Sequence, residues 1–310
     1  MAASELLLIT GPTAAGKSGV GLWLAERLGA EIVSVDSMKV YRGMDIGTAK
    51  PTREARARVP HHMIDVADPT EEYNVARYVS ETNAAIADIW RRGRRPLLVG
   101  GTPLYIRALL SGLFTGPGAD PQLRARLWER VRREGPAVLH EELQRVDPET
   151  AARLHPNDAR RIVRALEVFV ASGRPISALQ QQFKGEYRQP CRILALRRTP
   201  ADLRARIERR VEAMFARGWV EEVRGLLAHG GLGPTAGQAA GYREIVLHLQ
   251  GALSLPETIS RVKQTTWRIA RKQMAWLRHL PGVEWCEAAP DDAAETIGQR
   301  LYNTWLACHN

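Results

Sequence analysis

The fold is decided by the stretch Gly11-Pro12-Thr13-Ala14-Ala15-Gly16-Lys17-Ser18. It has the pattern G-x-x-x-x-G-K-[ST] of the phosphate-binding P-loop, which nucleotide-binding and ATP-binding proteins use. An apolar run at 6–9 precedes it as a buried strand, and a helical pattern follows, as the motif requires. Glycines let backbone N–H groups face phosphate oxygens, and the helix N-terminus adds partial positive charge. We expect Lys17 to reach the terminal phosphates and Ser18 to ligate Mg²⁺.

The totals describe an ordinary enzyme-sized chain. At 310 residues, with 45% hydrophobic and 25% charged residues, it has room for about two domains. No apolar stretch is long enough to span a membrane, and the N-terminus has no signal-peptide pattern, so we expect a cytoplasmic protein. Cys191, Cys286 and Cys308 are far apart, which argues against a disulfide framework and against a zinc finger.

The net charge of +10 permits a polyanionic partner, and most of the excess lies in 151–200 and 201–280. A helix at 201–217 carries Arg206, Arg210 and Arg217 on one stripe, and a helix at 257–279 carries Arg261, Arg268 and Lys272. A solvated charged face is an equal alternative for the first stripe. The preference for Arg over Lys is explained as well by a GC-rich genome as by phosphate recognition.

Two strand ends carry the candidate chemistry. Asp36 follows the strand 31–35, at the edge of an open α/β sheet where ligands bind, although an Asp there can also be a helix N-cap. The strand 97–99 ends in Gly100-Gly101-Thr102, where a P-loop triphosphatase usually has an Asp for Mg²⁺. We therefore expect the P-loop to hold a diphosphate that is a leaving group, rather than a triphosphate to be hydrolysed.

The remaining pattern predicts an α/β fold: a P-loop core with a parallel sheet flanked by helices, plus a helical insertion. We expect a core domain of residues 1–118 and 186–310 and an insertion of residues 119–185. Further elements are a long loop at 41–51, a helix at 72–93 and a strand at 194–196. The segment 121–183 reads as helical, with breaks at 147–148 and 155–158.

At this point the chain resembles the bacterial tRNA dimethylallyltransferases, also called tRNA isopentenyltransferases, of the IPP transferase family. The resemblance runs from about residue 6 to 278, and the run Asp45-Ile46-Gly47-Thr48-Ala49-Lys50-Pro51 is its most specific part. The other blocks are the P-loop, 34–37, 100–105, 155–158, 164–167, Arg206 with Ile207 and Arg210, 241–243, and 271–276.

The resemblance implies transfer of a dimethylallyl group from its diphosphate to N6 of adenosine 37, in tRNAs with adenosines at 36, 37 and 38, with Mg²⁺ as cofactor. It implies a monomer. An exocyclic amine is a poor nucleophile, so we expect Asp36 to accept its proton. Lys17, the P-loop amides and Arg210 would stabilise the leaving diphosphate, with a hydroxyl donated by Thr102. Arg206, one turn away, is the alternative to Arg210.

The resemblance also implies contacts with the tRNA anticodon stem-loop, whose adenosine 37 must be extruded from the stack. The implied RNA contacts are Asp36, Ser37, Met38, Lys39, Thr102, Arg124, Arg160, Arg161, Ile162, Val163, Arg164, Gln238, Gly241, Tyr242, Arg243, Arg271, Lys272 and Gln273. Three positions depart from the family pattern. Lys39 stands where many members have Gln or an apolar residue, Pro103 replaces a common Gly, and Trp267 replaces an Arg.

Three other functions remain open on the residues alone. A small-molecule kinase explains the P-loop but not the basic helices. An enzyme that prenylates a free adenine nucleotide explains the site but does not need basic surfaces. A non-catalytic RNA-binding protein with a relict P-loop leaves Lys17, Asp36 and Thr102 together without a reason.

Overall fold

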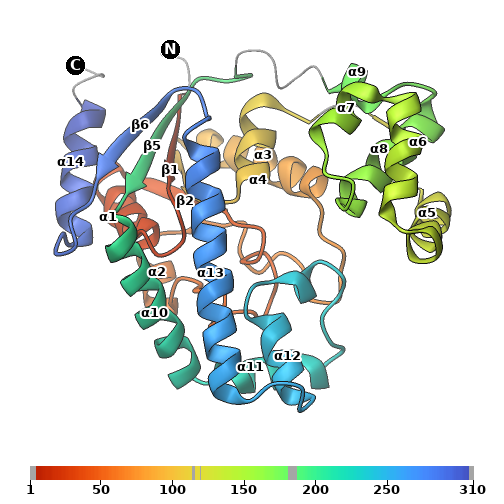
Figure 1. Ribbon diagram of the computed structural model, residues 1–310. Helices are drawn as coiled ribbons and strands as arrows, with labels where there is room; N and C mark the ends of the chain where they lie inside the picture. Colours follow the sequence, from red (N-terminus) through yellow and green to blue (C-terminus); the bar gives the residue numbers. More distant parts are fainter. Residues whose placement is uncertain (1–4, 114–115, 119, 181–186, 307–310) are drawn as a thin grey trace. The chain divides into compact units, whose positions relative to one another are not determined.

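The computed structural model describes residues 5–113, 116–118, 120–180 and 187–306 (Figure 1). The chain forms two compact units. The first, here called the sheet unit, comprises Met1–Leu110 and Gln189–Asn310, and the second, here called the helical unit, comprises Ser111–Arg188. The predicted insertion, 119–185, lies inside the helical unit. Each unit has its own hydrophobic core.

The sheet unit is built on six parallel strands in the order β3-β2-β4-β1-β5-β6. The central strands β1, β2 and β4 are apolar and almost entirely buried, because helices cover both faces of a parallel sheet. The strands are β1 (Leu6–Thr10), β2 (Ala30–Val35), β3 (His61–His62), β4 (Arg95–Gly100), β5 (Cys191–Arg197) and β6 (Val283–Glu287).

Helices α1 and α14 bury their apolar residues on one side of the sheet, in a core that includes Leu24, Leu301 and Trp305. Helix α3 packs on β2 and β4, where the Tyr78 ring stacks on Tyr105 at 3.9 Å and the Tyr78 hydroxyl donates to the Ser34 carbonyl. The helices of this unit are α1 (Lys17–Leu28), α2 (Arg53–Arg58), α3 (Val75–Arg91), α4 (Pro103–Ser111), α10 (Pro200–Ala216), α11 (Trp219–Ala228), the 3₁₀ turn η2 (Ala236–Gln238), α12 (Tyr242–Leu249), α13 (Leu255–Leu277) and α14 (Ala294–Leu306).

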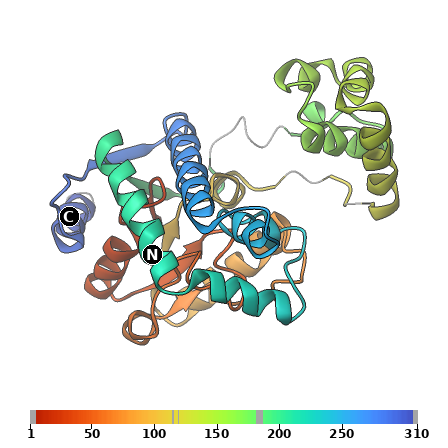
Figure 2. The same ribbon diagram turned by 60° about the horizontal axis from the view of Figure 1, so that its bottom comes forward.

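Helices α10 and α13 lie side by side beyond the carboxyl ends of the strands (Figures 1 and 2). Leu203, Ile207 and Val211 of α10 are buried and form its apolar stripe. Ser254 and Glu257 form a capping box that starts α13, with Pro256 in its first turn. The two helices thereby bring arginine-rich segments, distant in sequence from the P-loop, to the edge of the sheet where the P-loop lies.

In the described residues of the helical unit, five helices surround a core of Leu139, Leu143, Ile162, Leu166 and neighbouring residues. Asp158 caps the helix Ala159–Ser172 by accepting from the Arg161 backbone N–H. The buried Glu167 carboxylate accepts from both Arg124 and Arg164. The helices are α5 (Pro121–Glu134), α6 (Pro136–Val146), α7 (Pro148–Arg153), α8 (Ala159–Ser172) and α9 (Ile176–Leu179).

The predicted α/β fold with a parallel sheet and flanking helices is confirmed. Within the described residues, no helix has the length and apolar character needed to cross a bilayer. Cys191 and Cys286 are free thiols, and Cys308 lies outside the described residues. The segment 103–111, which follows the predicted strand 97–99 and the turn 100–102, forms helix α4.

Gly100 is required where β4 meets β2, because a Cβ at this position would lie 2.1 Å from the Val35 carbonyl oxygen. We predict that Gly100→Ala lowers the free energy of unfolding by about 3 kcal/mol, the upper range for overpacking. Gly225 of α11 has open space around it, so the control Gly225→Ala should raise stability by about 0.5–1 kcal/mol. Urea denaturation measures both, and equal stability of Gly100→Ala and the wild type would contradict the argument.

Candidate active site

The P-loop has the backbone geometry that a phosphate cradle needs. Gly11 and Gly16 have φ of 139° and 102°, and Ala14 has φ of 65°, so the chain curls between β1 and α1. A Cβ on Gly11 would lie 2.8 Å from the Leu196 carbonyl oxygen of β5. The buried Arg198 donates from Nε to the Ala15 carbonyl at 2.9 Å, which fixes the loop from the β5 side.

The ends of β2 and β4 are joined by three hydrogen bonds. The Val35 carbonyl accepts from the backbone N–H groups of Gly101 at 3.1 Å and Thr102 at 3.3 Å. In return, Thr102 Oγ1 accepts from the backbone N–H of Ser37 at 3.1 Å. These contacts fix the turn after β2 against the turn after β4. The Thr102 hydroxyl keeps its own proton to donate elsewhere.

Asp36 serves its own turn with one oxygen and leaves the other available. Its Oδ1 accepts from the backbone N–H groups of Met38 at 2.9 Å and Lys39 at 3.3 Å. No described residue donates a hydrogen bond to Oδ2. Asp36 can therefore stabilise its turn through Oδ1 and still act on a ligand through Oδ2.

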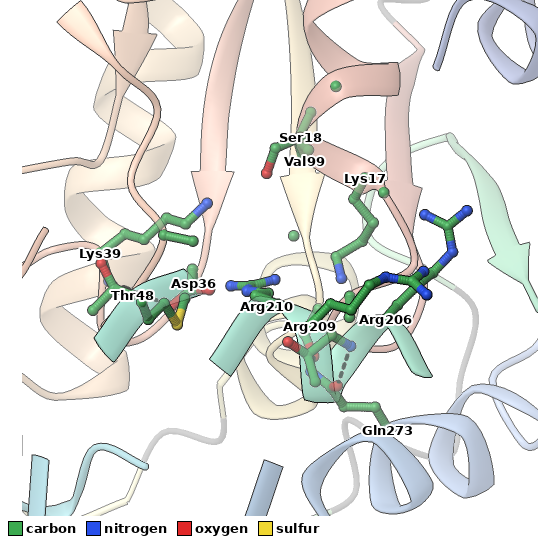
Figure 3. A pocket seen from close by; sticks show the side chains of 18 of the residues that line it. Lys17, Ser18, Asp36, Lys39, Thr48, Val99, Arg206, Arg209, Arg210 and Gln273 are labelled. Atoms are coloured by element: carbon green, nitrogen blue, oxygen red, sulfur yellow. Dashed lines mark hydrogen bonds between the residues drawn. The ribbon is translucent and has the colours of Figure 1, made fainter. Parts of the chain in front are cut away.

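Gln273 of α13 connects the P-loop to the end of β4. Its Oε1 accepts from the Thr13 backbone N–H at 2.8 Å, and its Nε2 donates to the Gly101 carbonyl at 2.7 Å (Figure 3). Both ends of the amide are thus bonded inside the chain. Gln273 was expected to contact RNA; its place in the structure gives it a role in holding the two loops together.

These loops surround a cavity of about 480 Å³ (Figure 3). The P-loop residues Thr13, Ala14, Gly16, Lys17 and Ser18 line it. So do six cationic residues but a single carboxylate, that of Asp36; the cations are Lys17, Lys39, Arg206, Arg209, Arg210 and Arg217. Burial, with the nearby charges of Arg210 and Lys39, lowers the pKa of Lys17 to about 7. Burial also lowers the pKa of Arg210.

The structure distinguishes the two candidate arginines of α10. Arg206 Nε donates to both oxygens of Asp202, and its guanidinium also donates to the Pro290 carbonyl. Arg210 has no hydrogen bond or ion pair to any described residue, although it lines the same cavity. Arg210 is therefore the guanidinium that is available to a ligand, while Arg206 is held by the chain.

The loop at 44–50 forms another part of the wall, through Thr48 and Ala49. Glu222 of α11 holds it by accepting from the backbone N–H groups of residues 45, 46 and 47, at 2.8, 2.6 and 3.3 Å. The buried Lys50 holds the other end by donating to the Tyr41 carbonyl, Asp45 and Asp65. No local pattern in the sequence indicates this role of Glu222.

The residues expected to bind RNA in the helical unit divide into three groups. Arg160 and Arg161 are exposed, and Arg161 also pairs with Asp158. Arg124 and Arg164 are about one-third exposed and bonded to Glu167, so each has a structural role as well. Ile162 and Val163, also expected to contact RNA, have side chains that are closed to solvent. They are 0% and 2% exposed in the core of this unit, where a helix that shows arginines to solvent must bury its other face.

Gln238, Arg243, Arg271 and Lys272 are exposed on the sheet unit. Tyr242, also expected to contact RNA, has a ring that is fully buried against Trp219 and a hydroxyl that donates to Glu222. Gly241 is also buried, and a Cβ there would lie 2.0 Å from Trp219. Between α12 and α13 a second cavity, of about 330 Å³, is lined by Arg243, Arg261, Arg268, Glu244, Leu247, Gln264 and Thr265.

The donor set fits a Mg²⁺ ion bound mainly by phosphate. Ser18 Oγ lines the cavity without a hydrogen bond to any described residue, and Asp36 Oδ2 lines the same cavity. Mg²⁺ prefers oxygen ligands and commonly takes one or two side chains, waters and substrate phosphates. Ser18 Oγ would hold the ion, and a bound Mg²⁺ would neutralise charge on a diphosphate, while Asp36 Oδ2 is left to accept a proton.

The sequence model of the IPP transferase family matches residues 39–280, and that of the isopentenyl transferases matches residues 4–60. The chain belongs to the IPP transferase family. The tRNA dimethylallyltransferase of Geobacter sulfurreducens is 47% identical over 303 residues, which cover 96% of this chain and 97% of that protein. The one of Geobacter metallireducens is 50% identical, covering 92% and 93%. The predicted family is confirmed, and with it the prediction of a prenyltransferase enzyme.

Solved structures agree with this assignment. The tRNA isopentenylpyrophosphate transferase of Bacillus halodurans has 37% identity and a TM-score of 0.73, covering 98% of this chain and 96% of that one. A eukaryotic dimethylallyltransferase, captured in crystals acting on tRNA, has 28% identity and a TM-score of 0.81. It is matched over 98% of this chain and 80% of its own.

Gln273 supplies a test of how the site is held together. We predict that Gln273→Ala lowers the free energy of unfolding by about 2 kcal/mol, because two hydrogen bonds of ~1 kcal/mol each are lost. It should also weaken inorganic diphosphate binding by about 10-fold, since the Thr13 N–H loses its fixed position. Gln299→Ala on α14, whose amide bonds only Asn303 at the surface, is the matched control. Unchanged stability and affinity would contradict the role assigned to Gln273.

Proposed function

We propose that this protein transfers a dimethylallyl group from dimethylallyl diphosphate to N6 of adenosine 37 in tRNAs with adenosines at positions 36, 37 and 38. Diphosphate is the leaving group and Mg²⁺ the cofactor, and the enzyme acts as a cytoplasmic monomer. One observation carries the proposal: an available carboxylate oxygen, on Asp36, lines the same cavity as the P-loop. Lys39 and Arg210, two cations that no described residue pairs, line that cavity as well.

The proposed reaction is a displacement at C1 of the prenyl group. The C1–O bond breaks and its electron pair goes to the diphosphate, while the N6–C1 bond forms. Asp36 Oδ2 accepts the proton that N6 loses. Lys17, Arg210 and the P-loop N–H groups stabilise the charge that develops on the diphosphate. Thr102 follows the cavity residue Gly101 without itself lining the cavity, and its hydroxyl retains a proton that it would donate to the diphosphate.

The lack of a carboxylate after β4 supports transfer over hydrolysis. A P-loop triphosphatase needs groups there to organise Mg²⁺ and an attacking water. Here Gly100 and Gly101 occupy the place, and a side chain on either would collide with the Val35 or the Gly11 carbonyl. The carboxylate of the site instead follows β2, where it faces an incoming acceptor.

RNA as the acceptor is supported by arginines that the chain leaves unpaired. Arg243, Arg261 and Arg268 line the second cavity, and none of them forms a hydrogen bond or ion pair with a described residue. Arg261 and Arg268 are seven residues apart on α13, about two helical turns. Phosphate contacts of this kind position an RNA, while extruded bases carry the sequence information.

Parallel incubations with different acceptors distinguish the proposed function from a nucleotide prenyltransferase and from a kinase. Purified protein, Mg²⁺ and labelled dimethylallyl diphosphate would be incubated with unmodified tRNA, with AMP, or with ATP and small metabolites. Label on tRNA alone is the expected result. Label on AMP would instead indicate a nucleotide prenyltransferase, and consumption of ATP without label transfer would indicate a kinase.

Asp36→Asn tests the proposed base. Asn retains an Oδ1 that accepts the Met38 and Lys39 N–H groups but cannot take a proton from N6. We expect unchanged diphosphate affinity and a kcat about 10²-fold lower or more, the usual contribution of a general base. Wild-type turnover in this variant would remove Asp36 from the mechanism.

The second cavity gives a prediction about RNA affinity. The double variant Arg261→Ala and Arg268→Ala should bind tRNA more weakly than the wild type. The slope of the logarithm of the tRNA association constant against the logarithm of the salt concentration should become shallower by about 1.5, because two phosphate contacts are lost. The control is Arg91→Ala with Arg94→Ala, two exposed arginines near the amino end of β4, the opposite edge of the sheet. An identical slope for the test variant and the wild type would place the RNA elsewhere.

A further inference from the structure

Lys39 extends into the cavity from the turn that follows β2. Its backbone N–H donates to Asp36 Oδ1 at 3.3 Å, which fixes the point from which its side chain starts. The side chain lines the same cavity as Lys17, Ser18 and Arg210. Figure 3 shows its amine directed into the space bordered by Ser18, Asp36 and Arg210.

The Lys39 ammonium has no partner among the described residues: neither a hydrogen bond nor an ion pair involves its Nζ. Lys50, a buried lysine of the adjoining loop, is the contrast, because its Nζ donates to one carbonyl and two carboxylates. An ammonium removed from water without such partners is costly. A role in stabilising the fold therefore does not account for Lys39.

The charges around Lys39 are mostly of its own sign. Burial lowers its pKa, the negative charge of Asp36 opposes this, and Arg210, Lys50 and Arg56 lower it further. Lys39 in turn is one of the charges that lower the pKa of Lys17. Lys17, Lys39 and Arg210 thus converge around a single carboxylate whose Oδ1 is already occupied. Such a cluster is repulsive by itself and is stabilised when a polyanion binds between its members.

We propose that Lys39 binds the diphosphate of the prenyl donor as a third cation beside Lys17 and Arg210. This inference rests on the proposed function, and it moves Lys39 from the RNA, where the family resemblance placed it, to the leaving group. As the C1–O bond breaks, the electron pair passes to the diphosphate oxygen, and the ammonium stabilises that charge. The proton of N6 still goes to Asp36.

The test compares Lys39→Met, which keeps the unbranched stem but removes the charge, with Lys39→Arg, which keeps a cation. Isothermal titration with inorganic diphosphate and Mg²⁺ measures affinity without any acceptor. We expect Lys39→Met to bind about 10- to 100-fold more weakly, as for loss of a charged hydrogen bond, and Lys39→Arg to retain most of the affinity. Affinity for tRNA alone should stay within about 2-fold of the wild type in both.

Thermal unfolding gives a readout that a structural role would not produce. Without ligand, Lys39→Met should unfold at a higher temperature than the wild type, because a repulsive charge is gone. Added diphosphate should then raise its Tm by less than it raises that of the wild type. The matched control is Lys263→Met on α13, whose lysine pairs with Glu212 and does not line the cavity, and it should keep the wild-type affinity.

The outcomes separate the inference from the proposed function. Wild-type diphosphate affinity in Lys39→Met, equal loss in Lys39→Met and Lys39→Arg, or loss of tRNA affinity alone would each overturn the assignment of Lys39. The proposed function fails separately, when the wild type binds diphosphate but transfers no prenyl group to tRNA.

Discussion

The carbonyl oxygen of Val35 accepts the backbone N–H groups of Gly101 and Thr102, and the arrangement of the site depends on this contact. It brings the ends of β2 and β4 so close that Gly100 cannot carry a side chain. The carboxylate of the site must then come from the end of β2. Asp36 supplies it, and the Ser37 N–H that follows is held by Thr102. The acidic residue of the site, Asp36, therefore follows β2 and not β4. This placement fits the proposed transfer of a prenyl group better than hydrolysis of a triphosphate.

A second constraint is the excess of positive charge in the cavity. Arg206 pairs with Asp202, a carboxylate that it shares with Arg198, whereas no carboxylate in the described part of the chain forms an ion pair with Lys17, Lys39 or Arg210. The structure tolerates the repulsion because separate elements hold the charges: α1, the turn after β2 and α10. Arg198 and Gln273 hold the P-loop itself. We infer that Lys17, Lys39 and Arg210 are placed to bind a polyanion rather than to stabilise the fold.

Much of this could be predicted from the sequence. The P-loop, the buried strands and Asp36 follow from local patterns, since each is decided by residues near it in the chain. Strand β3 has only two residues and β6 includes Glu284 and Glu287, so neither has the apolar run that identifies a strand. Helix α14 (Ala294–Leu306) depends on packing against α1 (Lys17–Leu28), at the other end of the chain. Such long-range contacts have no local signal.

The residues of the site also divide into those that a local pattern identifies and those that depend on long-range contacts. Residues next to the motif were predicted, whereas the roles of Gln273 and Glu222 depend on side chains that meet backbone far away in sequence. Ile162, Val163 and Tyr242 show the opposite case, in which the family segment is recognised but the burial of the side chain is not. They belong to segments that resemble RNA-binding segments of the family, but the apolar side chains of those segments turn inward to form cores. Segment position alone does not say which face a residue occupies.

Mapping the product tests the central claim most directly. Unmodified tRNA would be incubated with the protein, Mg²⁺ and dimethylallyl diphosphate, digested with nuclease, and analysed by mass spectrometry. The account predicts one dimethylallyl group per tRNA, on N6 of adenosine 37, and no product when that base is replaced by guanosine. A prenyl group on another nucleotide, or full reaction of the guanosine variant, would contradict it.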